Sequence, residues 1–322
     1  MKETVLDCDF LILNRLPGLY SAERFQSEIT RLNRKAQLVT PEWLIENASQ
    51  FESRGLGLGV LYRQGDFNFW PTQMALMKLP FNIINTPSAF LNARDKWLTT
   101  QAWQKQNIPV PRTRVLTDFI SNTTILNSAE IFLALQETFG LPFMIKKRFS
   151  SQGHGVFLIN DEYSLMTLLM QDTHLFMNTG TLEQKYFKAE LQAATTPPSN
   201  LWMQLRRWVA QECIQESLGT DTRVFAIQDK HFSITRHNSN SFRSNMHQGG
   251  KPQSTELTPV ETQFCQMIHA QSGLNYSGID FLRTESGPRF LEINPSPGFE
   301  GIEIIYKENI AEKIINEINR SI

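Results

Sequence analysis

The stretch from Gly278 to Glu303 constrains the fold of this chain more than any other. Two runs of alternating apolar residues, Gly278 to Leu282 and Arg289 to Ile293, flank four residues that form or tolerate turns. This pattern predicts a β-hairpin. Pro295 and Pro297 follow directly, and proline has no backbone N–H to donate to a neighbouring strand, so the second strand is expected to leave the sheet there.

Three oxygen-bearing side chains are predicted to share one face of this hairpin. Symmetry about Ser286 places Asp280 opposite Glu292, and Asn294 joins them because side chains two positions apart on a strand share a face. Facing carboxylates repel unless a cation lies between them, and oxygen ligands suit Mg²⁺. A solvated acidic ladder is the competing interpretation. The prolines and glycines that follow favour a bound ligand, because they bring backbone close to whatever occupies the face.

Charge and cysteine content exclude several classes of protein. The 322 residues carry a formal net charge of −1, which gives no general attraction for nucleic acid or an anionic membrane. No apolar run approaches the roughly 20 residues of a membrane span, so we expect a cytoplasmic protein. Cys8, Cys213 and Cys265 are too scattered for a disulfide framework or a CxxC metal site, which favours reduced thiols.

The first ninety or so residues alternate strand and helix signals. Phe10 to Leu13, Val60 to Tyr62 and Asn82 to Ile84 are short apolar strand candidates, and an amphipathic helix is expected to start near Ser21, which can cap it. Alternating signals of this kind predict an α/β domain with a parallel sheet. We place a domain boundary near Arg94.

A basic, glycine-containing loop lies between two further strand candidates. Phe143 to Lys146 and Val156 to Ile159 flank the loop from 147 to 155, whose amides and basic residues suit phosphate oxygens. A second loop, from Ser241 to Gly250, could wrap phosphate in the same way through Arg243. Either loop could instead be a solvated turn.

The run from Asp221 to His237 predicts another hairpin. A two-residue turn at Asp229 and Lys230 places Arg223 opposite Arg236. Two facing arginines repel as facing acids do, so an anion between them and two side chains splayed into water remain equal alternatives.

Taken in order, these motifs resemble the ATP-grasp superfamily, most closely its RimK-like branch of α-L-glutamate ligases. The resemblance covers nearly the whole chain, and the two C-terminal motifs are its most specific. The motifs are LILNRLPGLYSAERF, INTPSAFLNARDKWLTTQ, PFMIKKRFSSQGHGV, QECIQESLGTDTRVFAI, FRSNMHQGG, GIDF and LEINPSPGFEGIE.

The resemblance implies an α/β (α+β) ATP-grasp fold, with two subdomains that clamp ATP behind an N-terminal Rossmann-like domain. Residues 1–94 would form that pre-ATP-grasp domain, and residues 95–322 the ATP-grasp domain. Within it, a central lid subdomain would span about 112–209 and a C-terminal metal and nucleotide subdomain about 210–322. The segment from about 171 to 207 exceeds the family's usual short connection and would be an insertion in the lid.

The resemblance also implies roles for individual residues. Asp280, Glu292 and Asn294 would hold Mg²⁺ or Mn²⁺, with two ions expected, in agreement with the hairpin geometry. Lys146, and with less support Lys96, would hold the ATP phosphates.

Further residues would bind adenine or act on the transferring phosphoryl group. Arg243 would stabilise that group and the acyl phosphate, with help from Arg236. The remaining nucleotide-pocket residues implied by the resemblance are Gln211, Glu212, Cys213, Ile214, Glu216 and Asp221. The loop from 147 to 155, which resembles the flexible flap of the family, is more basic than the family pattern through Lys147 and Arg148. Cys213 stands where an aromatic or aliphatic residue is common.

The implied reaction is ATP-dependent ligation of a carboxylate to an amine through an acyl phosphate. The partners would be ATP, a carboxylate substrate and an amine acceptor, which could be an amino acid, a peptide, a protein tail or a small molecule, with glutamate or a similar amino acid being added. A homo-oligomer is left open. Two alternatives use the same nucleotide clamp: a phosphotransferase, and a regulatory protein that binds nucleotide without turnover. The complete set of metal ligands and arginines argues against a regulatory protein without turnover.

Overall fold

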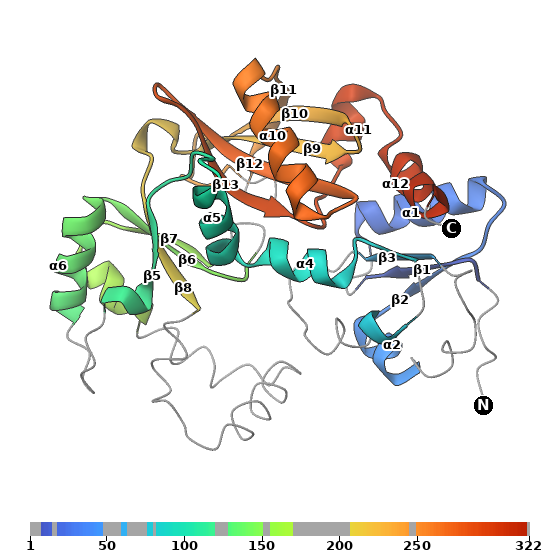
Figure 1. Cartoon of the computed structure of the whole chain (residues 1–322), viewed down its shortest axis with the longest axis horizontal. Coiled ribbons are helices and arrows are strands. Elements are labelled where there is room, and N and C mark those ends of the chain that lie inside the picture. Colours follow the sequence, from blue (N-terminus) through green and yellow to red (C-terminus); the bar gives the residue numbers. More distant parts are fainter. Residues whose placement is uncertain are drawn as a thin grey trace.

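Three β-sheets follow one another along the described part of the chain. The computed structural model describes residues 8–14, 18–47, 59–62, 76–79, 82–119, 128–150, 155–169, 207–244 and 249–320. Figure 1 shows the first sheet and the second at opposite ends of the molecule, with the third sheet between and above them.

The first sheet is four-stranded, parallel and covered on both faces. Its strand order is β2–β1–β3–β4. In β1, Phe10 and Ile12 pack into one core cluster while Leu11 and Leu13 pack into another, as side-chain alternation requires. The fully apolar strand is therefore typical of a buried parallel sheet. The bounds are β1 (Phe10–Leu13), β2 (Ala36–Val39), β3 (Gly59–Tyr62), β4 (Asn82–Ile84), α1 (Tyr20–Arg31) and α2 (Pro41–Asn47).

The three strands predicted in this region are confirmed, but the start of the first helix is not as predicted. Helix α1 begins at Tyr20 with Leu19 as its N-cap, and Leu19 makes no side-chain capping bond. Ser21 lies buried within the first turn, so it does not cap the helix. Strand β2 and helix α2 were not predicted.

The second sheet is antiparallel, with strand order β5–β8–β6–β7. Helix α6 covers one face, where Leu135 and Phe139 pack against Phe143 and Ile145. The strand from Phe143 extends one residue beyond its predicted end at Lys146. The bounds are β5 (Thr113–Val115), β6 (Phe143–Lys147), β7 (Val156–Ile159), β8 (Trp208–Glu212), α6 (Ser128–Phe139) and the short 3-10 helix η3 (Leu116–Phe119).

The third sheet is antiparallel and five-stranded, with strand order β11–β10–β9–β12–β13. Helix α10 packs on one face, and α11 and α12 lie toward the first sheet (Figure 1). Thr258 and Glu261 form a capping box that fixes the start of α10. The bounds are β9 (Thr220–Ile227), β10 (Lys230–His237), β11 (Lys251–Ser254), β12 (Tyr276–Thr284), β13 (Gly287–Asn294), α10 (Pro259–Ser272), α11 (Glu300–Tyr306), α12 (Ile310–Arg320) and the 3-10 helix η4 (Gln215–Ser217).

Two helices connect the first sheet to the rest of the chain. Helix α4 (Pro87–Arg94) follows the first sheet, and α5 (Lys96–Lys105) packs on β13. Asp95, between them, caps α5 by accepting from the backbone N–H groups of Trp97 and Leu98. Helix α5 therefore begins at a fixed point beside the third sheet.

One face of the third sheet changes character along its strands. In β9, Phe225 and Ile227 pack into the apolar cluster shared with α1, α11 and α12. Asp221 and Arg223 lie on the same face because they differ from these residues by even numbers, yet they carry charge. The apolar half of this face thus packs against α1, α11 and α12, whereas the charged half takes no part in that apolar cluster.

The predicted pairing of Asp280 with Glu292 is confirmed, although the turn is not centred on Ser286. Thr284 pairs with Gly287, so the two-residue turn is Glu285–Ser286. That register alone would place Leu291 opposite Asp280. A bulge between Asp280 and Phe281 shifts the register by one residue and brings Glu292 opposite Asp280.

The predicted register of the β9–β10 hairpin is wrong by one turn position. Gln228, with a φ of 54°, and Asp229 form the turn, and Lys230 pairs with Ile227. On β10, Arg236 therefore lies opposite Asp221 of β9, and Ile234 lies opposite Arg223. The two arginines do not face each other, because the turn lies one residue earlier than the predicted Asp229–Lys230, which shifts each pairing by two residues.

Several predicted features lie outside the described residues. They include most of the insertion predicted at 171–207, the flap residues 151–154, and residues 245–248 of the second basic loop. None of the helices in the described ranges combines the length and apolar character needed to span a bilayer.

Gly278 and Gly298 offer a matched test of packing beside the hairpin. A Cβ atom on Gly278 would lie 2.7 Å from Cβ of Pro297, whereas one on Gly298 would meet nothing within 4 Å. We expect Gly278→Ala to lower the free energy of unfolding by about 1–3 kcal/mol through overpacking, and Gly298→Ala to leave it nearly unchanged. Urea denaturation measures both, and equal losses would contradict the packing described for this turn.

Candidate active site

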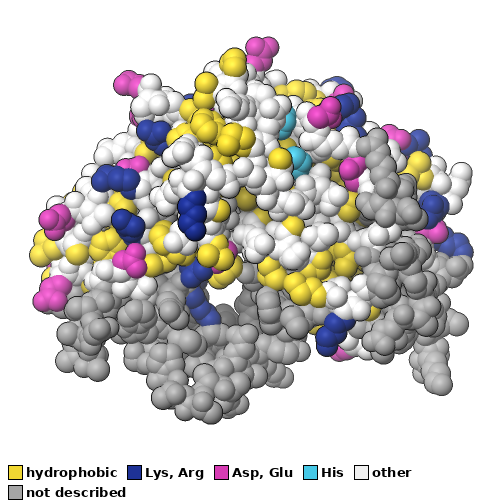
Figure 2. Space-filling model, viewed as in Figure 1, with side chains coloured by type: hydrophobic (Ala, Val, Ile, Leu, Met, Phe, Trp, Pro, Cys, Tyr) yellow, Lys and Arg dark blue, Asp and Glu magenta, His cyan; other side chains and the backbone are white. Residues whose placement is uncertain are grey.

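A pocket opens between the second and third sheets. Apolar side chains from both sheets line part of it, including Met144, Val209 and Leu282. Charged side chains line the rest: Lys96, Lys146, Glu212, Asp221, Arg243, Asp280 and Glu292. Figure 2 shows a hollow in this view of the molecule, with lysine and arginine side chains along one side of it. The pocket therefore offers an apolar wall next to a dense group of charges.

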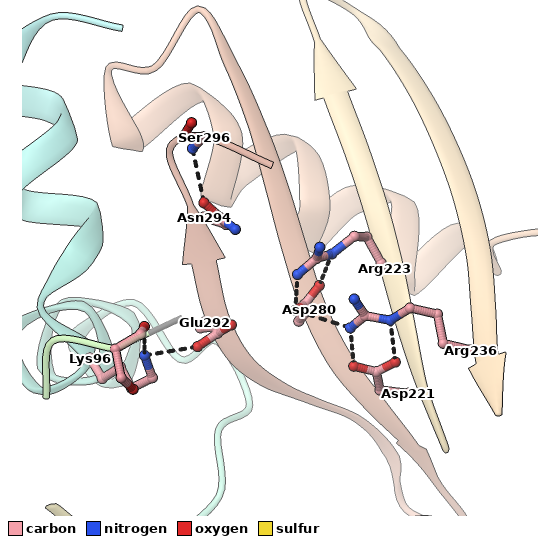
Figure 3. A network of polar contacts seen from close by, with 9 residues as sticks. Lys96, Asp221, Arg223, Arg236, Asp280, Glu292, Asn294 and Ser296 are labelled. Carbon is pink, nitrogen blue, oxygen red and sulfur yellow. Dashed lines mark hydrogen bonds and ion pairs between the residues drawn. The ribbon is translucent and has the colours of Figure 1, made fainter. Parts of the chain in front are cut away.

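A buried ion-pair network lies at the base of the pocket (Figure 3). Arg223 binds Asp280 with both ends of its guanidinium, with Nε 2.7 Å from Oδ1 and Nη2 2.5 Å from Oδ2. Arg236 binds Asp221 in the same two-pronged way, and its Nη2 also lies 3.2 Å from Asp280 Oδ2. The two aspartates take the place of the bound anion considered from the sequence.

Burial and charge oppose each other in this network. Arg236 and Asp280 are each only 2% exposed. Burial disfavours the charge on Asp280, but Arg223 and Arg236 outweigh it and hold the pKa of the carboxyl below its usual value. Burial likewise opposes the charge on Arg236, and the two aspartates outweigh it to raise its pKa. Both shifts favour the charged forms of Asp280 and Arg236, and each of these two groups depends on its partners.

Glu292 lies on the neighbouring strand and has one cationic partner. Lys96 Nζ is 3.0 Å from Glu292 Oε2 and also donates to the carbonyl of Ser150 at 2.8 Å. Burial disfavours the charge on Glu292, and Lys96 outweighs it to lower the pKa. Asn294, two residues on, accepts the backbone N–H of Ser296 at 2.9 Å. Figure 3 shows Asn294 following Glu292 along β13.

The oxygen atoms of these side chains have capacity left for a hard cation. A carboxylate offers about four acceptor positions. The two arginines use three on Asp280, whereas Lys96 uses one on Glu292 and Ser296 uses one on Asn294. Across the described ranges, no three His, Cys, Asp or Glu side chains gather as a metal site, so the candidate set is two carboxylates and an amide. This all-oxygen set fits Mg²⁺, with Glu292 as its freest ligand.

Among the described residues of the pocket, Lys146 and Arg243 are the two cations that are hydrogen-bonded only to neutral groups. Lys146 Nζ donates to Oε1 of Gln211 at 2.5 Å. Arg243 donates through Nη2 to the carbonyl of Val156, and its guanidinium lies 4.3 Å from the ring centroid of Phe242. Burial lowers the pKa of both side chains, that of Lys146 to about 8. Two partly desolvated cations without a carboxylate at contact distance favour an anionic ligand.

The segment predicted to bind adenine lines the pocket, but Glu216, which was also predicted to line it, does not. Gln211, Glu212, Cys213 and Ile214 all contribute to the lining. The Gln211 amide is held between Lys146 and Thr113, and Glu212 pairs with Arg112. Glu216 does not reach the lining: it is exposed and accepts the backbone N–H of Glu285 at 3.2 Å. Burial raises the pKa of the Cys213 thiol, which favours its uncharged form.

Comparison with known proteins decides the family. The sequence model of the RimK-like ATP-grasp domain matches residues 93–318. The chain belongs to the RimK-like ATP-grasp family. Enzymes of this family use ATP, and this chain is an ATP-grasp ligase, a class that forms carbon–nitrogen bonds and releases ADP.

Named relatives cover nearly the same length. A protein of Legionella pneumophila (strain Corby), named "Probable alpha-L-glutamate ligase", is 27% identical over 96% of this chain and 94% of its own length. A protein of Shewanella frigidimarina, named "Probable alpha-L-glutamate ligase 1", is 31% identical over 74% of this chain and 67% of its own.

Solved structures support the ATP-grasp fold. A RimK domain ATP-grasp protein from Sphaerobacter thermophilus superposes with a TM-score of 0.66 at 17% identity, covering 95% of this chain and 98% of that one. D-alanine–D-alanine ligase from Bacillus anthracis, solved with ATP, gives 0.63 at 15% identity, covering 97% of each chain. The α/β fold with an ATP-grasp architecture expected from the motifs is thereby confirmed.

Arg223 was missed as a site residue of this RimK-like ligase. The sequence pattern paired it with Arg236, whereas the fold pairs it with Asp280 on β12. The alternation of Asp221 and Arg223 along one strand was the available signal, because both side chains must share a face with Asp280. The strand order of the sheet was needed to use it.

The buried pair Arg236–Asp221 should matter more to stability than an exposed pair does. Arg236→Ala leaves Asp221 buried without its main partner, and we expect a loss of about 3–5 kcal/mol in the free energy of unfolding. Arg112, whose side chain is 62% exposed beside Glu212, is the matched control, and Arg112→Ala should cost no more than about 1 kcal/mol. Urea denaturation tests this, and similar losses in both variants would contradict the buried network.

Lys146 should make nucleotide binding depend on pH. Phosphate favours the charged ammonium, so the affinity for ADP should be greatest below the pKa of about 8 and fall as the pH rises through it. Lys146→Arg keeps its charge throughout this range and should remove that dependence. Calorimetric titration with ADP at a series of pH values measures both proteins, and parallel pH profiles would argue against phosphate contact by Lys146.

Proposed function

We propose that this chain joins a carboxylate to an amine, with ATP activating the carboxylate as an acyl phosphate. The observation that carries the proposal is the pair Lys146 and Arg243, two cations with neutral partners in a pocket that the Asp280 and Glu292 side chains also line. Such an arrangement suits a phosphoryl group that is attacked and released, because fixed positive charge is aimed at developing negative charge.

The nucleotide would lie along the pocket from the apolar wall to the charges. Gln211 to Ile214 would present the adenine-binding edge beside Met144 and Leu282. Lys146 would bind the phosphates, with Lys96 as a second contact. Asp221 lines the pocket, but its carboxylate is already taken by Arg236, so its part is to hold the arginine.

Asp280, Glu292 and Asn294 would hold Mg²⁺ or Mn²⁺, and we propose two ions. Bound divalent cations would neutralise phosphoryl oxygens and orient the triphosphate. Arg223 and Arg236 hold the Asp280 carboxylate in place by three hydrogen bonds. We therefore propose that Arg236 positions the metal ligand Asp280 and does not contact the phosphoryl group. Its guanidinium is buried between two aspartates.

The chemistry needs no side-chain nucleophile. A carboxylate oxygen of the substrate attacks the γ-phosphorus, the bond to the β-phosphate oxygen breaks, and ADP leaves. The amine nitrogen of the acceptor then attacks the acyl carbon, phosphate leaves with the bonding electrons, and the nitrogen loses a proton to give the amide. Arg243 would stabilise the phosphoryl oxygens in the first step and the leaving phosphate in the second.

The names of the relatives support a class of substrate. Two are named as alpha-L-glutamate ligases, which supports glutamate or a similar amino acid as the added group. One solved neighbour of the same fold is an ATP-grasp ligase complexed with a precursor peptide, which supports a peptide among the acceptors. We further propose the division into residues 1–94 and 95–322, supported by the family match that begins at residue 93.

Arg243 should affect turnover far more than binding. Its charge is needed most in the transition state and for the acyl phosphate, so Arg243→Ala should bind ATP nearly as well as wild type but turn over roughly a hundred- to a thousandfold more slowly. Hydroxylamine added with ATP and a carboxylate substrate such as glutamate should trap the acyl phosphate of the wild type as a hydroxamate. The variant should yield almost none.

A control variant and two alternative results complete this test. Arg289 lies at the turn end of β13, where it donates to Ser286, so Arg289→Ala should trap hydroxamate as the wild type does. Wild-type ADP release without hydroxamate, for every carboxylate that supports release, would count against the ligase. Recovery of a phosphate ester would favour a phosphotransferase.

A further inference from the structure

The exit of β6 and the start of α5 run side by side and are joined by four contacts. The backbone N–H of Lys96 donates to the carbonyl of Arg148 at 3.2 Å, and the Lys96 ammonium donates to the carbonyl of Ser150 at 2.8 Å. The Arg148 guanidinium binds Asp95 with two prongs, Nε 3.1 Å from Oδ1 and Nη2 2.5 Å from Oδ2. We call this set of residues, Asp95, Lys96, Arg148 and Ser150, the clasp.

Asp95 serves two purposes within the clasp. Its Oδ1 caps α5 by accepting from the N–H groups of Trp97 and Leu98, while both of its oxygens receive Arg148. The side chains of Asp95 and Arg148 are 5% and 20% exposed. A two-pronged, mostly buried pair of this kind is geometrically stricter than a surface ion pair. The first residues of α5 therefore have one orientation relative to the second sheet.

The clasp fixes the position of Lys96. Its backbone is tied to Arg148, its neighbour Asp95 is tied to the Arg148 side chain, and its ammonium lies between Ser150 and Glu292. A free lysine has four rotatable side-chain bonds and loses much conformational entropy when it binds. Held in the clasp, the Lys96 ammonium is already inside the pocket beside a proposed metal ligand.

We propose that Arg148 is a positioning residue for nucleotide binding, which acts through Lys96. The inference rests on the proposed function, because it requires that Lys96 meet the nucleotide phosphates. Arg148 itself is absent from the pocket lining, whereas Lys96 and Ser150 belong to it. The guanidinium would thus act on Lys96 from outside the pocket, through its ion pair with the neighbouring Asp95.

The test is a double-mutant cycle between Arg148 and Lys96. The probe is the non-hydrolysable ATP analogue adenylyl imidodiphosphate with Mg²⁺, titrated by calorimetry. Arg148→Gln alone should weaken binding about tenfold, the size of coupling expected between neighbouring charged groups. In a Lys96→Met background, the same change should alter the affinity less than about twofold, because the residue through which Arg148 acts is gone.

A second variant separates the ion pair from the helix cap. Asp95→Asn keeps an N-cap residue of equal quality but loses the charge that Arg148 binds. It should weaken analogue binding about as much as Arg148→Gln does and should likewise have little effect once Lys96 is Met. This variant also serves if Arg148→Gln does not fold. Arg114→Gln, on the exposed side of β5, is the matched control and should bind as the wild type does.

Each result decides the matter. Equal losses with and without Lys96 would mean that Arg148 supports the fold generally, and would overturn the inference. Unchanged affinity in Arg148→Gln and Asp95→Asn would overturn it also, while leaving the ligase proposal intact. A wild type that does not bind the analogue at all would overturn the proposed function, and the inference with it.

Discussion

The buried carboxylate of Asp280 is the constraint on which the rest of the site depends. A charge that is almost wholly removed from water is stable only with close, well-aligned partners, and Arg223 and Arg236 supply three hydrogen bonds to it. Arg236 in turn requires Asp221. The charged half of the third sheet is thus a set of mutually dependent groups, which gives the pocket a rigid, nearly neutral base. Above that base, Lys146 and Arg243 remain available to an anion.

The same dependence explains what could be predicted from the sequence. Alternation along Gly278–Ile293 and the prolines after it were enough to predict the hairpin and the pairing of Asp280 with Glu292. The predicted turn was centred on Ser286, half a residue from the centre of the actual turn. The bulge between Asp280 and Phe281 compensates for this difference and restores the predicted pairing. In the β9–β10 hairpin no bulge follows the turn at Gln228, so the same kind of error gave Arg236 the wrong partner. Local patterns indicate strands well, but register depends on turns and bulges that the pattern does not specify.

Long-range partners lay beyond prediction for a different reason. Arg148 and Asp95, like Lys96 and Glu292, are far apart in sequence and meet only because α5 packs between the second and third sheets. The sequence contains many acidic residues with which a basic loop residue such as Arg148 could pair, and no local pattern identifies the one that it contacts. The resemblance to ATP-grasp enzymes predicted the fold and most of the pocket lining. It did not predict that a flap arginine would be bound to the cap of α5, because that residue departs from the family pattern.

The account holds that the enzyme activates a carboxylate by transferring the γ-phosphoryl group of ATP to it, and isotope transfer tests this most directly. A carboxylate substrate labelled with ¹⁸O in its carboxyl group, glutamate first, is turned over with ATP and an amine acceptor, and the phosphate released is examined by mass spectrometry. Attack by the carboxylate oxygen leaves one ¹⁸O atom in the phosphate for each amide formed. Phosphate that is free of ¹⁸O while labelled amide accumulates would contradict the acyl-phosphate mechanism.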